Sequence, residues 1–347
     1  MSVYGKRGAA RGVFSAEYAG KNGCVHFASE GMGRGRGFLT NCETVYDEEE
    51  KTLKKPFFTG CGTALITPFC NGKLDLDCFR ALVRRQLNAG IDALVVCATT
   101  GEAPTLDRSE RAALIRVCVE LSAGRVPVIA GSGSNCTAAA AELSREAEGL
   151  GADGVLVVTP YYNKATQAGL AAHYTAVADA VHIPVILYNV PSRTGVSCAA
   201  ETYASLSRHS NIAGVKEASG SFALVQDTRN LCSADFCIWS GNDEDTTAIM
   251  ALGGEGVIST AANLIPEDMR ELTRLALSGS LHKAGVLQLR MTDLLHALFC
   301  EVNPIPVKTA MARLGLCSDE LRLPLCAMGE ENRERLFRAM DAYGLRA

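Results

Sequence analysis

The chain has 347 residues, of which 48% are hydrophobic and 21% are charged, and its formal net charge is −4. This acidic balance argues against nucleic acid as a partner, because phosphate binding requires a basic surface. No apolar run approaches the roughly 18 residues that a membrane span needs. We therefore expect a globular protein that acts neither on nucleic acid nor in a membrane.

The fourteen cysteines are scattered along the chain, and none of them form a Cys-x-x-Cys pair. Several lie within apolar runs, as Cys97 does, where cysteine behaves as a small hydrophobic residue. This pattern indicates reduced thiols in a cytoplasmic protein rather than a disulfide framework.

Residues 1–55 differ in composition from the rest of the chain. Residues 1–42 hold nine of the 33 glycines and show no hydrophobic period, so they supply no face to bury. We expect a disordered leader over 1–55. Three alternatives are an RNA-contacting tail at the Gly-Arg-Gly-Arg-Gly run of 33–37, an organellar transit peptide, since the segment is poor in acidic residues, and a segment that is not translated, with the true start at Leu53.

Eight short apolar runs follow, and amphipathic segments alternate with them. The runs are mostly continuous, as is typical of strands buried on both faces. The expected strands are 63–67, 93–98, 126–130, 154–158, 184–188, 212–216, 236–240 and 256–260. Eight strand–helix units within 56–280 predict an α/β fold, a (β/α)8 TIM barrel. A doubly wound sheet is the alternative, but no Gly-x-Gly-x-x-Gly follows the first strand.

Helix signals support this reading. Asp107 and Thr137 are expected N-caps, and Pro266 is expected to open a helix. Residues 281–347 exceed what a barrel needs and predict three further helices. We expect this C-terminal extension to pack outside the barrel or at a subunit contact.

Active sites of such barrels lie at the carboxyl ends of the strands. Lys216 directly follows an apolar run there, so we expect its amine to be partly desolvated. Its pKa then falls, and the neutral amine can form a Schiff base with a ketone. The alternative is a lysine that simply reaches solvent at the end of a strand.

Other polar residues at strand ends fit the same chemistry. Tyr162 and Tyr188 offer hydroxyls that can move a proton beside the lysine, and Thr99 can connect them. Arg193 lies on a short loop suited to bidentate capture of a carboxylate, although a surface arginine is the simpler alternative. The six histidines show no ligand spacing, so we expect no metal, and we expect no cofactor.

Six segments of the chain carry a resemblance to a known family. They are Thr-Thr-Gly-Glu at 99–102, Thr-Pro-Tyr-Tyr-Asn at 159–163, Tyr-Asn-Val-Pro-Ser-Arg-Thr-Gly at 188–195, Gly-Val-Lys-Glu-Ala at 214–218, Asn-Pro-Ile-Pro-Val-Lys at 303–308 and Leu-Arg-Leu-Pro at 321–324. They closely resemble the dihydrodipicolinate synthase family of the pyruvate-dependent class I aldolase and N-acetylneuraminate lyase superfamily. The resemblance covers about residues 56–347 and leaves the leader unmatched.

The resemblance implies a Schiff-base lyase of lysine and diaminopimelate biosynthesis. This enzyme would condense pyruvate with L-aspartate 4-semialdehyde on Lys216 to give 4-hydroxy-tetrahydrodipicolinate. The alternative is another pyruvate-dependent aldolase of the superfamily, such as an N-acetylneuraminate or keto-sugar-acid lyase. A third alternative is a barrel that binds ligands but has lost catalysis. The presence of Lys216, both tyrosines and Thr99 argues against it.

Roles for single residues also follow from the resemblance. Tyr188 would donate and accept the proton, and Thr99 would link it to a tyrosine of the neighbouring subunit, for which we favour Tyr162 over Tyr161. Thr100 and Ile258 would contact pyruvate, and Arg193 would bind the carboxylate of the semialdehyde. The expected assembly is a homo-oligomer, a dimer of dimers.

The resemblance finally bears on regulation by L-lysine. Lysine-inhibited members bind the amino acid at a subunit interface, where an acidic residue receives its ammonium group. Ala139 matches that acid here, and Arg108 and Arg111 match two histidines of that site. We therefore expect feeble inhibition or none.

Overall fold

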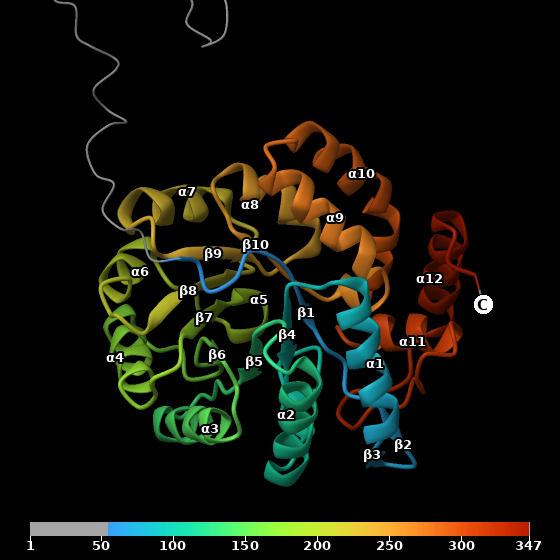
Figure 1. The fold of residues 1–347 in the computed structure, drawn as a ribbon, viewed down its shortest axis with the longest axis horizontal. Coiled ribbons are helices and arrows are strands. Elements are labelled where there is room, and N and C mark those ends of the chain that lie inside the picture. The colour runs from blue at the N-terminus through green and yellow to red at the C-terminus, as the bar shows by residue number, and fades with distance from the viewer. Residues whose placement is uncertain (1–54, 347) are drawn as a thin grey trace, which may run out of the picture. The chain divides into compact units, whose positions relative to one another are not determined.

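A computed structural model describes residues 55–346 of the chain. Eight strands form a closed barrel (Figure 1). In chain order they are β1 Gly60–Ala64, β4 Ala93–Val96, β5 Val128–Gly131, β6 Gly154–Val158, β7 Val185–Asn189, β8 Ile212–Glu217, β9 Cys237–Ser240 and β10 Gly256–Ser259. All pairs are parallel, and β1 closes the ring between β4 and β10. The predicted (β/α)8 barrel is confirmed, whereas the predicted leader lies outside the described residues except for Lys55.

The first strand begins earlier than the sequence predicts. It covers Gly60–Ala64, whereas the apolar pattern placed it at 63–67. Glycine has low strand propensity, so the pattern gave no weight to the two glycines of this strand. In the structure Gly62 packs closely on its surroundings, because a Cβ there would come within 3.3 Å of the Phe58 ring. Close approach, rather than propensity, therefore explains the glycine at this position.

Helices and short turns connect the strands and surround the barrel (Figure 1). The helices are α1 Leu76–Ala89, α2 Arg108–Ser122, α3 Thr137–Gly149, α4 Gln167–Ala178, α5 Pro191–Thr194, α6 Ala200–Leu206, α7 Phe222–Leu231, α8 Thr246–Ala251 and α9 Pro266–Leu277. The 3-10 turns are η2 Ala103–Thr105, η3 Asp243–Asp245 and η4 Ala261–Asn263, and a small ribbon pairs β2 Phe69–Cys70 with β3 Lys73–Leu74. None of the helices of residues 55–346 combines the length and apolarity that crossing a bilayer requires.

The two expected N-caps have different outcomes. Asp107 caps α2, because its carboxylate accepts the backbone N–H of Glu110 over 2.8 Å and Glu110 accepts that of Asp107 over 3.1 Å. Thr137 is not a cap, since Cys136 occupies the N-cap position of α3. The hydroxyl of Thr137 instead lies 2.9 Å from the ring nitrogen Nδ1 of His173. A partner on another helix thus takes the hydroxyl away from the helix end.

The predicted C-terminal helices are present. They are α10 Leu281–Leu298, α11 Ile305–Arg313 and α12 Glu330–Tyr343, drawn in orange and red in Figure 1. The hydroxyl of Tyr343 donates to Asp268 over 2.8 Å and so ties α12 to α9. The barrel and these helices belong to one compact unit.

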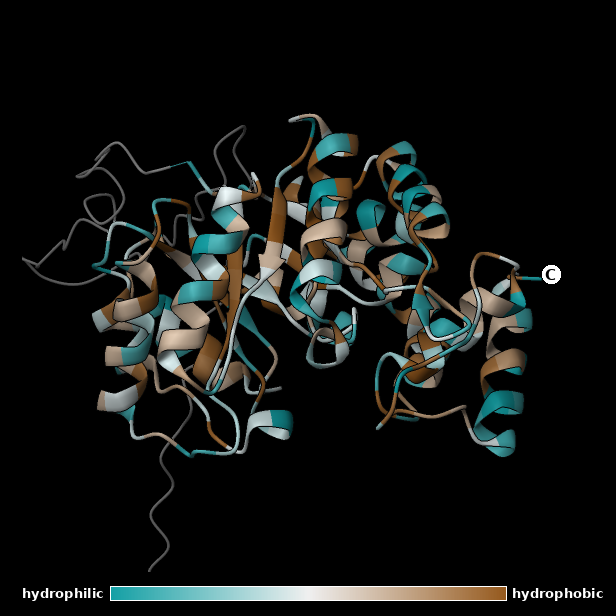
Figure 2. Cartoon of the chain, turned by 90° about the horizontal axis from the view of Figure 1, so that it is seen from below, coloured by the Kyte–Doolittle hydropathy of each residue, from teal (hydrophilic) through white to brown (hydrophobic). Residues whose placement is uncertain are grey.

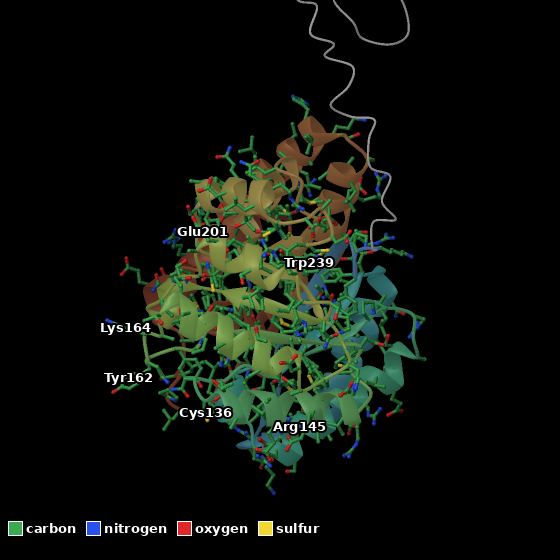
Figure 3. All side chains as sticks on the ribbon, turned by 90° about the vertical axis from the view of Figure 1, so that its left-hand side faces the viewer. Cys136, Arg145, Tyr162, Lys164, Glu201 and Trp239 are labelled. Carbon is green, nitrogen blue, oxygen red and sulfur yellow. The ribbon has the colours of Figure 1, made fainter. Side chains whose placement is uncertain are left out.

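Apolar side chains pack into two clusters, one inside the barrel and one between the barrel and the helices. Figure 2 shows hydrophobic residues gathered along the strands. Inside the barrel, Trp239 stacks on Phe58 with ring centroids 4.8 Å apart, and its indole N–H donates to the Phe58 carbonyl over 3.2 Å. Figure 3 shows Trp239 in the middle of the molecule. Since Phe58 lies two residues before β1, this pair closes the end of the barrel where the strands begin.

We predict that Phe58→Ala lowers the free energy of unfolding by about 3–5 kcal/mol, because it leaves a cavity under Trp239. The matched control is Phe299→Ala, since Phe299 is 44% exposed, and its loss should stay below about 1 kcal/mol. Urea unfolding followed by circular dichroism at one protein concentration measures both. Equal losses in the two variants would contradict this role of Phe58.

Candidate active site

Lys216 lies on β8 with its side chain inside the barrel. Successive strand residues point to opposite faces, so Lys216 points inward and Glu217 points outward to the helices. Lys216 pairs in register with Tyr188 of β7 and with Trp239 of β9. Its Nζ lies 4.5 Å from the centroid of the Tyr188 ring, and the residue is only 4% exposed. The barrel thus holds an amine against a tyrosine in a nearly dry environment.

Burial lowers the pKa of Lys216 to about 8, because the ammonium form loses its hydration there. The carboxylate of Asp243 opposes this fall, and the guanidinium of Arg193 adds to it. Only the neutral amine attacks a carbonyl carbon. A pKa near 8 keeps a useful fraction of the amine neutral close to neutral pH, as a Schiff-base lysine requires.

Tyr188 and Thr99 lie together beside this lysine. Tyr188 is 6% exposed, and burial raises the pKa of its hydroxyl. The nearby Arg193 and a hydrogen bond with the side chain of Thr99 act in the opposite direction and lower that pKa. The structure therefore brings together Lys216, Tyr188 and Thr99, as the sequence predicts.

Thr99 and Thr100 follow β4 in a tight turn that Glu102 closes with a left-handed φ of 53°. Thr100 is 2% exposed, and its hydroxyl lies 3.2 Å from that of Thr260. The side-chain amide of Asn303 donates to the same hydroxyl of Thr100 over 2.9 Å. These bonds fix the rotamer of Thr100 before any ligand is present.

A cavity of about 500 Å³ opens at the carboxyl ends of the strands. Thr99, Tyr188 and Arg193 line it, together with Tyr161 and Asn303. The guanidinium of Arg193 donates to the backbone carbonyl of Asn303 over 3.2 Å, which leaves further N–H groups for a ligand. The cavity thus combines proton-transfer groups with a cation that can bind a carboxylate.

Four predicted site residues are not among those that line this cavity: Lys216, Thr100, Ile258 and Tyr162. Ile258 of β10 is fully buried in the cluster inside the barrel. Tyr162 is 88% exposed, and Figure 3 shows it at the edge of the molecule with its side chain pointing outward. Its φ of 72° is uncommon for a residue other than glycine. Tyr161, the other tyrosine considered, is 39% exposed and lines the cavity.

Sequence reasoning missed Asp243 and Asn303. Asp243 is 1% exposed, and its Oδ2 accepts the backbone N–H groups of Thr260 and Ala261 over 3.1 and 2.9 Å. Asn303 belongs to the C-terminal extension, which was expected only outside the barrel or at a subunit contact. The segment 303–308 resembled the family, but barrel periodicity cannot place a residue beyond the eighth strand–helix unit.

The described residues do not gather three histidine, cysteine, aspartate or glutamate side chains in a way that could hold a metal ion. The cysteines of this part of the chain are free thiols, and burial raises the pKa of Cys97 to about 11. Of the groups described above, the hydroxyls of Thr99 and Tyr188 and the guanidinium of Arg193 line the cavity.

Lysine-dependent barrel enzymes form imines with keto acids by means of a desolvated amine at the carboxyl ends of a parallel barrel. The fold and cavity place this chain in that class.

Comparison with known proteins narrows the class. The Dihydrodipicolinate synthetase family model matches residues 57–343. A 4-hydroxy-tetrahydrodipicolinate synthase of Alkaliphilus oremlandii is 50% identical over 288 residues, which cover 83% of this chain and 99% of that protein. The chain belongs to the dihydrodipicolinate synthetase family.

Solved structures of the same family have the same fold as this chain. The dihydrodipicolinate synthase of Thermotoga maritima superposes with a TM-score of 0.82 at 44% identity, over 83% of this chain and 99% of that one. The enzyme of Cyanidioschyzon merolae with lysine bound has a TM-score of 0.81 at 39% identity, over 84% of this chain and 100% of that one.

Proposed function

We propose that the chain is a lyase that condenses pyruvate with L-aspartate 4-semialdehyde through a Schiff base on Lys216. The product is 4-hydroxy-tetrahydrodipicolinate, an intermediate of lysine and diaminopimelate biosynthesis. The observation that carries the proposal is the buried Lys216 amine, whose pKa is about 8, beside Tyr188 in a chain of this family. We further propose that the enzyme acts in the cytoplasm, where its free thiols stay reduced.

The neutral Nζ of Lys216 attacks the ketone carbon of pyruvate, and loss of water from the carbinolamine leaves a protonated imine. Loss of a methyl proton then gives an enamine, whose carbon attacks the aldehyde carbon of the semialdehyde. Cyclisation by the amine of the substrate releases Lys216. Tyr188 donates and accepts the protons of these steps, with Thr99 as its hydrogen-bonded neighbour.

Three further residues bind the substrates in this proposal. Thr100 and Ile258 contact pyruvate, where Ile258 offers an apolar surface to the methyl group. Arg193 binds the carboxylate of the semialdehyde from its place in the cavity wall. An N-acetylneuraminate or keto-sugar-acid lyase is the alternative, but a sugar substrate needs hydroxyl partners where this cavity has Arg193.

Tyr162 acts in the site of a neighbouring copy of the chain in this proposal. Its ring is almost fully exposed, and its backbone is held in a strained left-handed conformation. Such strain typically persists where it serves a function. An outward aromatic that inserts into a partner completes the proton relay, so a dimer is the smallest competent unit. Two such dimers make the proposed dimer of dimers.

We predict that pyruvate and cyanoborohydride leave a covalent adduct on Lys216. The initial trapping rate should rise about tenfold from pH 7 to pH 9 and then level off, because the neutral fraction of an amine with a pKa of about 8 rises through that range. Peptide mass mapping locates the adduct, and a pH series measures the rate.

The matched controls are Lys216→Arg, which should give no adduct, and Lys73→Arg at an exposed lysine, which should keep it. An adduct on another lysine, or a rate that falls with pH, would refute the mechanism. The same preparation should convert aspartate semialdehyde and pyruvate but should not cleave N-acetylneuraminate. The reverse preference would favour the alternative lyase.

We predict that Lys216→Ala and Tyr162→Phe variants complement each other. Loss of the relay hydroxyl should cost about 10²–10⁴ in rate. Refolding an equal mixture of the two variants should restore about a quarter of the wild-type activity, because half of the dimers are mixed and each holds one complete site. Activity of the mixture that only equals the mean of the two variants would place Tyr162 outside the partner's site.

We predict feeble inhibition by L-lysine. Ala139 offers no carboxylate for the ligand ammonium, and Arg108 is bound to Glu142 and Glu146 over 3.0 and 3.1 Å. A missing charge-assisted hydrogen bond costs about 1.5–3 kcal/mol, so binding should weaken at least about tenfold. Activity titrations at subsaturating pyruvate test this, and Ala139→Glu should increase the sensitivity. Strong inhibition of the unmodified chain well below millimolar lysine would prove the prediction wrong.

A further inference from the structure

A buried ion pair connects the site turn to the C-terminal helices, and no step of the proposed chemistry uses it. Lys308 of α11 donates from Nζ to Oε1 of Glu102 over 2.8 Å, and neither side chain has any solvent exposure. The two residues lie 206 positions apart in the chain. Glu102 closes the turn that begins at Thr99, so the pair acts directly on the frame of the site.

The pair is fully hydrogen-bonded. Besides Glu102, the ammonium of Lys308 has the backbone carbonyls of Thr67, over 3.0 Å, and of Glu320 as acceptors. The second carboxylate oxygen of Glu102 accepts the backbone N–H of Arg322 over 3.1 Å. Two buried charges lose their hydration, so such a pair seldom stabilises a fold more than apolar residues of the same size. Its value lies in the geometry that it imposes.

That geometry is the turn carrying Thr99. The left-handed φ of Glu102 is unfavourable for a residue with a side chain unless its surroundings hold it. The backbone N–H of Glu102 donates to the carbonyl of Thr99 over 3.1 Å, and the hydroxyl of Thr67 donates to the carbonyl of Gly101 over 2.7 Å. Thr99 and Tyr188 line the same cavity, and the side chain of Thr99 lowers the pKa of the Tyr188 hydroxyl. A shift of Glu102 therefore moves Thr99 relative to Tyr188.

We propose that Glu102 and Lys308 are positioning residues, which hold the hydroxyl of Thr99 against Tyr188 for proton transfer. This inference rests on the proposed function, in which Tyr188 and Thr99 move the protons. Asn303, on the segment that leads into α11, gives the same turn a second attachment through Thr100. The C-terminal extension is thereby part of the frame of the active site.

The test is the double variant Glu102→Gln/Lys308→Met, which removes both charges and keeps the side-chain lengths. We expect kcat to fall about 10- to 100-fold, because small displacements of catalytic groups have effects of this size, with KM for aspartate semialdehyde within about twofold. Adding Thr99→Val to the double variant should give an enzyme no slower than Thr99→Val alone, because the pair acts through Thr99.

The matched control is Arg313→Met/Asp341→Asn, which removes a partly exposed ion pair of 2.7 Å from the same extension and should leave kcat unchanged. A folded Glu102→Gln/Lys308→Met variant with wild-type kcat would overturn the inference. So would losses that multiply when Thr99→Val is added, or an equal loss of kcat in the control. Failure of the proposed function is distinguishable, because the wild-type chain itself would then not condense the two substrates.

A milder variant keeps the test decisive if the double variant does not fold. Glu102→Asp retains the charge but shortens the side chain by one methylene, so the turn must shift to keep its bond to Lys308. We expect kcat to fall while the thermal midpoint and the fluorescence of Trp239, the one tryptophan of the chain, stay close to those of the wild type. A folded Glu102→Asp variant with wild-type kcat would equally overturn the inference.

Discussion

Desolvation of a single amine is the interaction on which this site depends. Lys216 points into a barrel whose interior is filled with apolar side chains, and the stacked rings of Trp239 and Phe58 close its far end. Tyr188 of the neighbouring strand lies beside the amine, with its ring centroid 4.5 Å from Nζ. Burial lowers the pKa of the amine, and the buried carboxylate of Asp243 limits how far it falls. The environment, rather than one strong neighbour, sets the reactivity of the lysine.

The neighbouring residue on the same strand shows the opposite use of burial. Glu217 faces the helices, and burial raises the pKa of its carboxyl group. That group accepts hydrogen bonds from the Tyr203 hydroxyl over 3.0 Å, from the Asn189 amide over 3.0 Å and from the backbone N–H of Ser219 over 2.8 Å. These bonds fix the end of β8 between β7 and α6. One strand thus carries a reactive residue on its inner face and an anchoring residue on its outer face.

The sequence predicts those parts of the fold that depend on local pattern. Continuous apolar runs identify the eight strands, and only the glycine-rich first strand was placed late, because close packing of Gly62 leaves no mark on hydrophobicity. The polar residues at strand ends follow from the topology, so Lys216, Tyr188 and Thr99 were predicted to lie together, as the structure has them.

Contacts between distant segments were beyond the sequence pattern. Asn303 reaches Thr100, and Lys308 reaches Glu102, from an extension whose packing no periodicity describes. The N-cap predicted at Thr137 was wrong for the same reason, because the hydroxyl of Thr137 contacts His173 of a different helix. The residues that Tyr162 would contact in a second copy of the chain could not be predicted either, because strand order and residue spacing describe a single copy.

The closed ring of strands also determines the order in which parts of the fold can be completed while the chain is being synthesised. β1 is among the first elements to leave the ribosome, but one of its edges pairs only with β10, close to 200 residues later in the chain. Until then that edge stays open to wrong pairing, as free strand edges generally are. The turn carrying Thr99 waits longer still, since its anchor on α11 is made after the ring has closed. A nascent chain therefore completes its barrel before it completes the turn that carries Thr99. The amine of Lys216 is buried in the barrel before that turn is anchored.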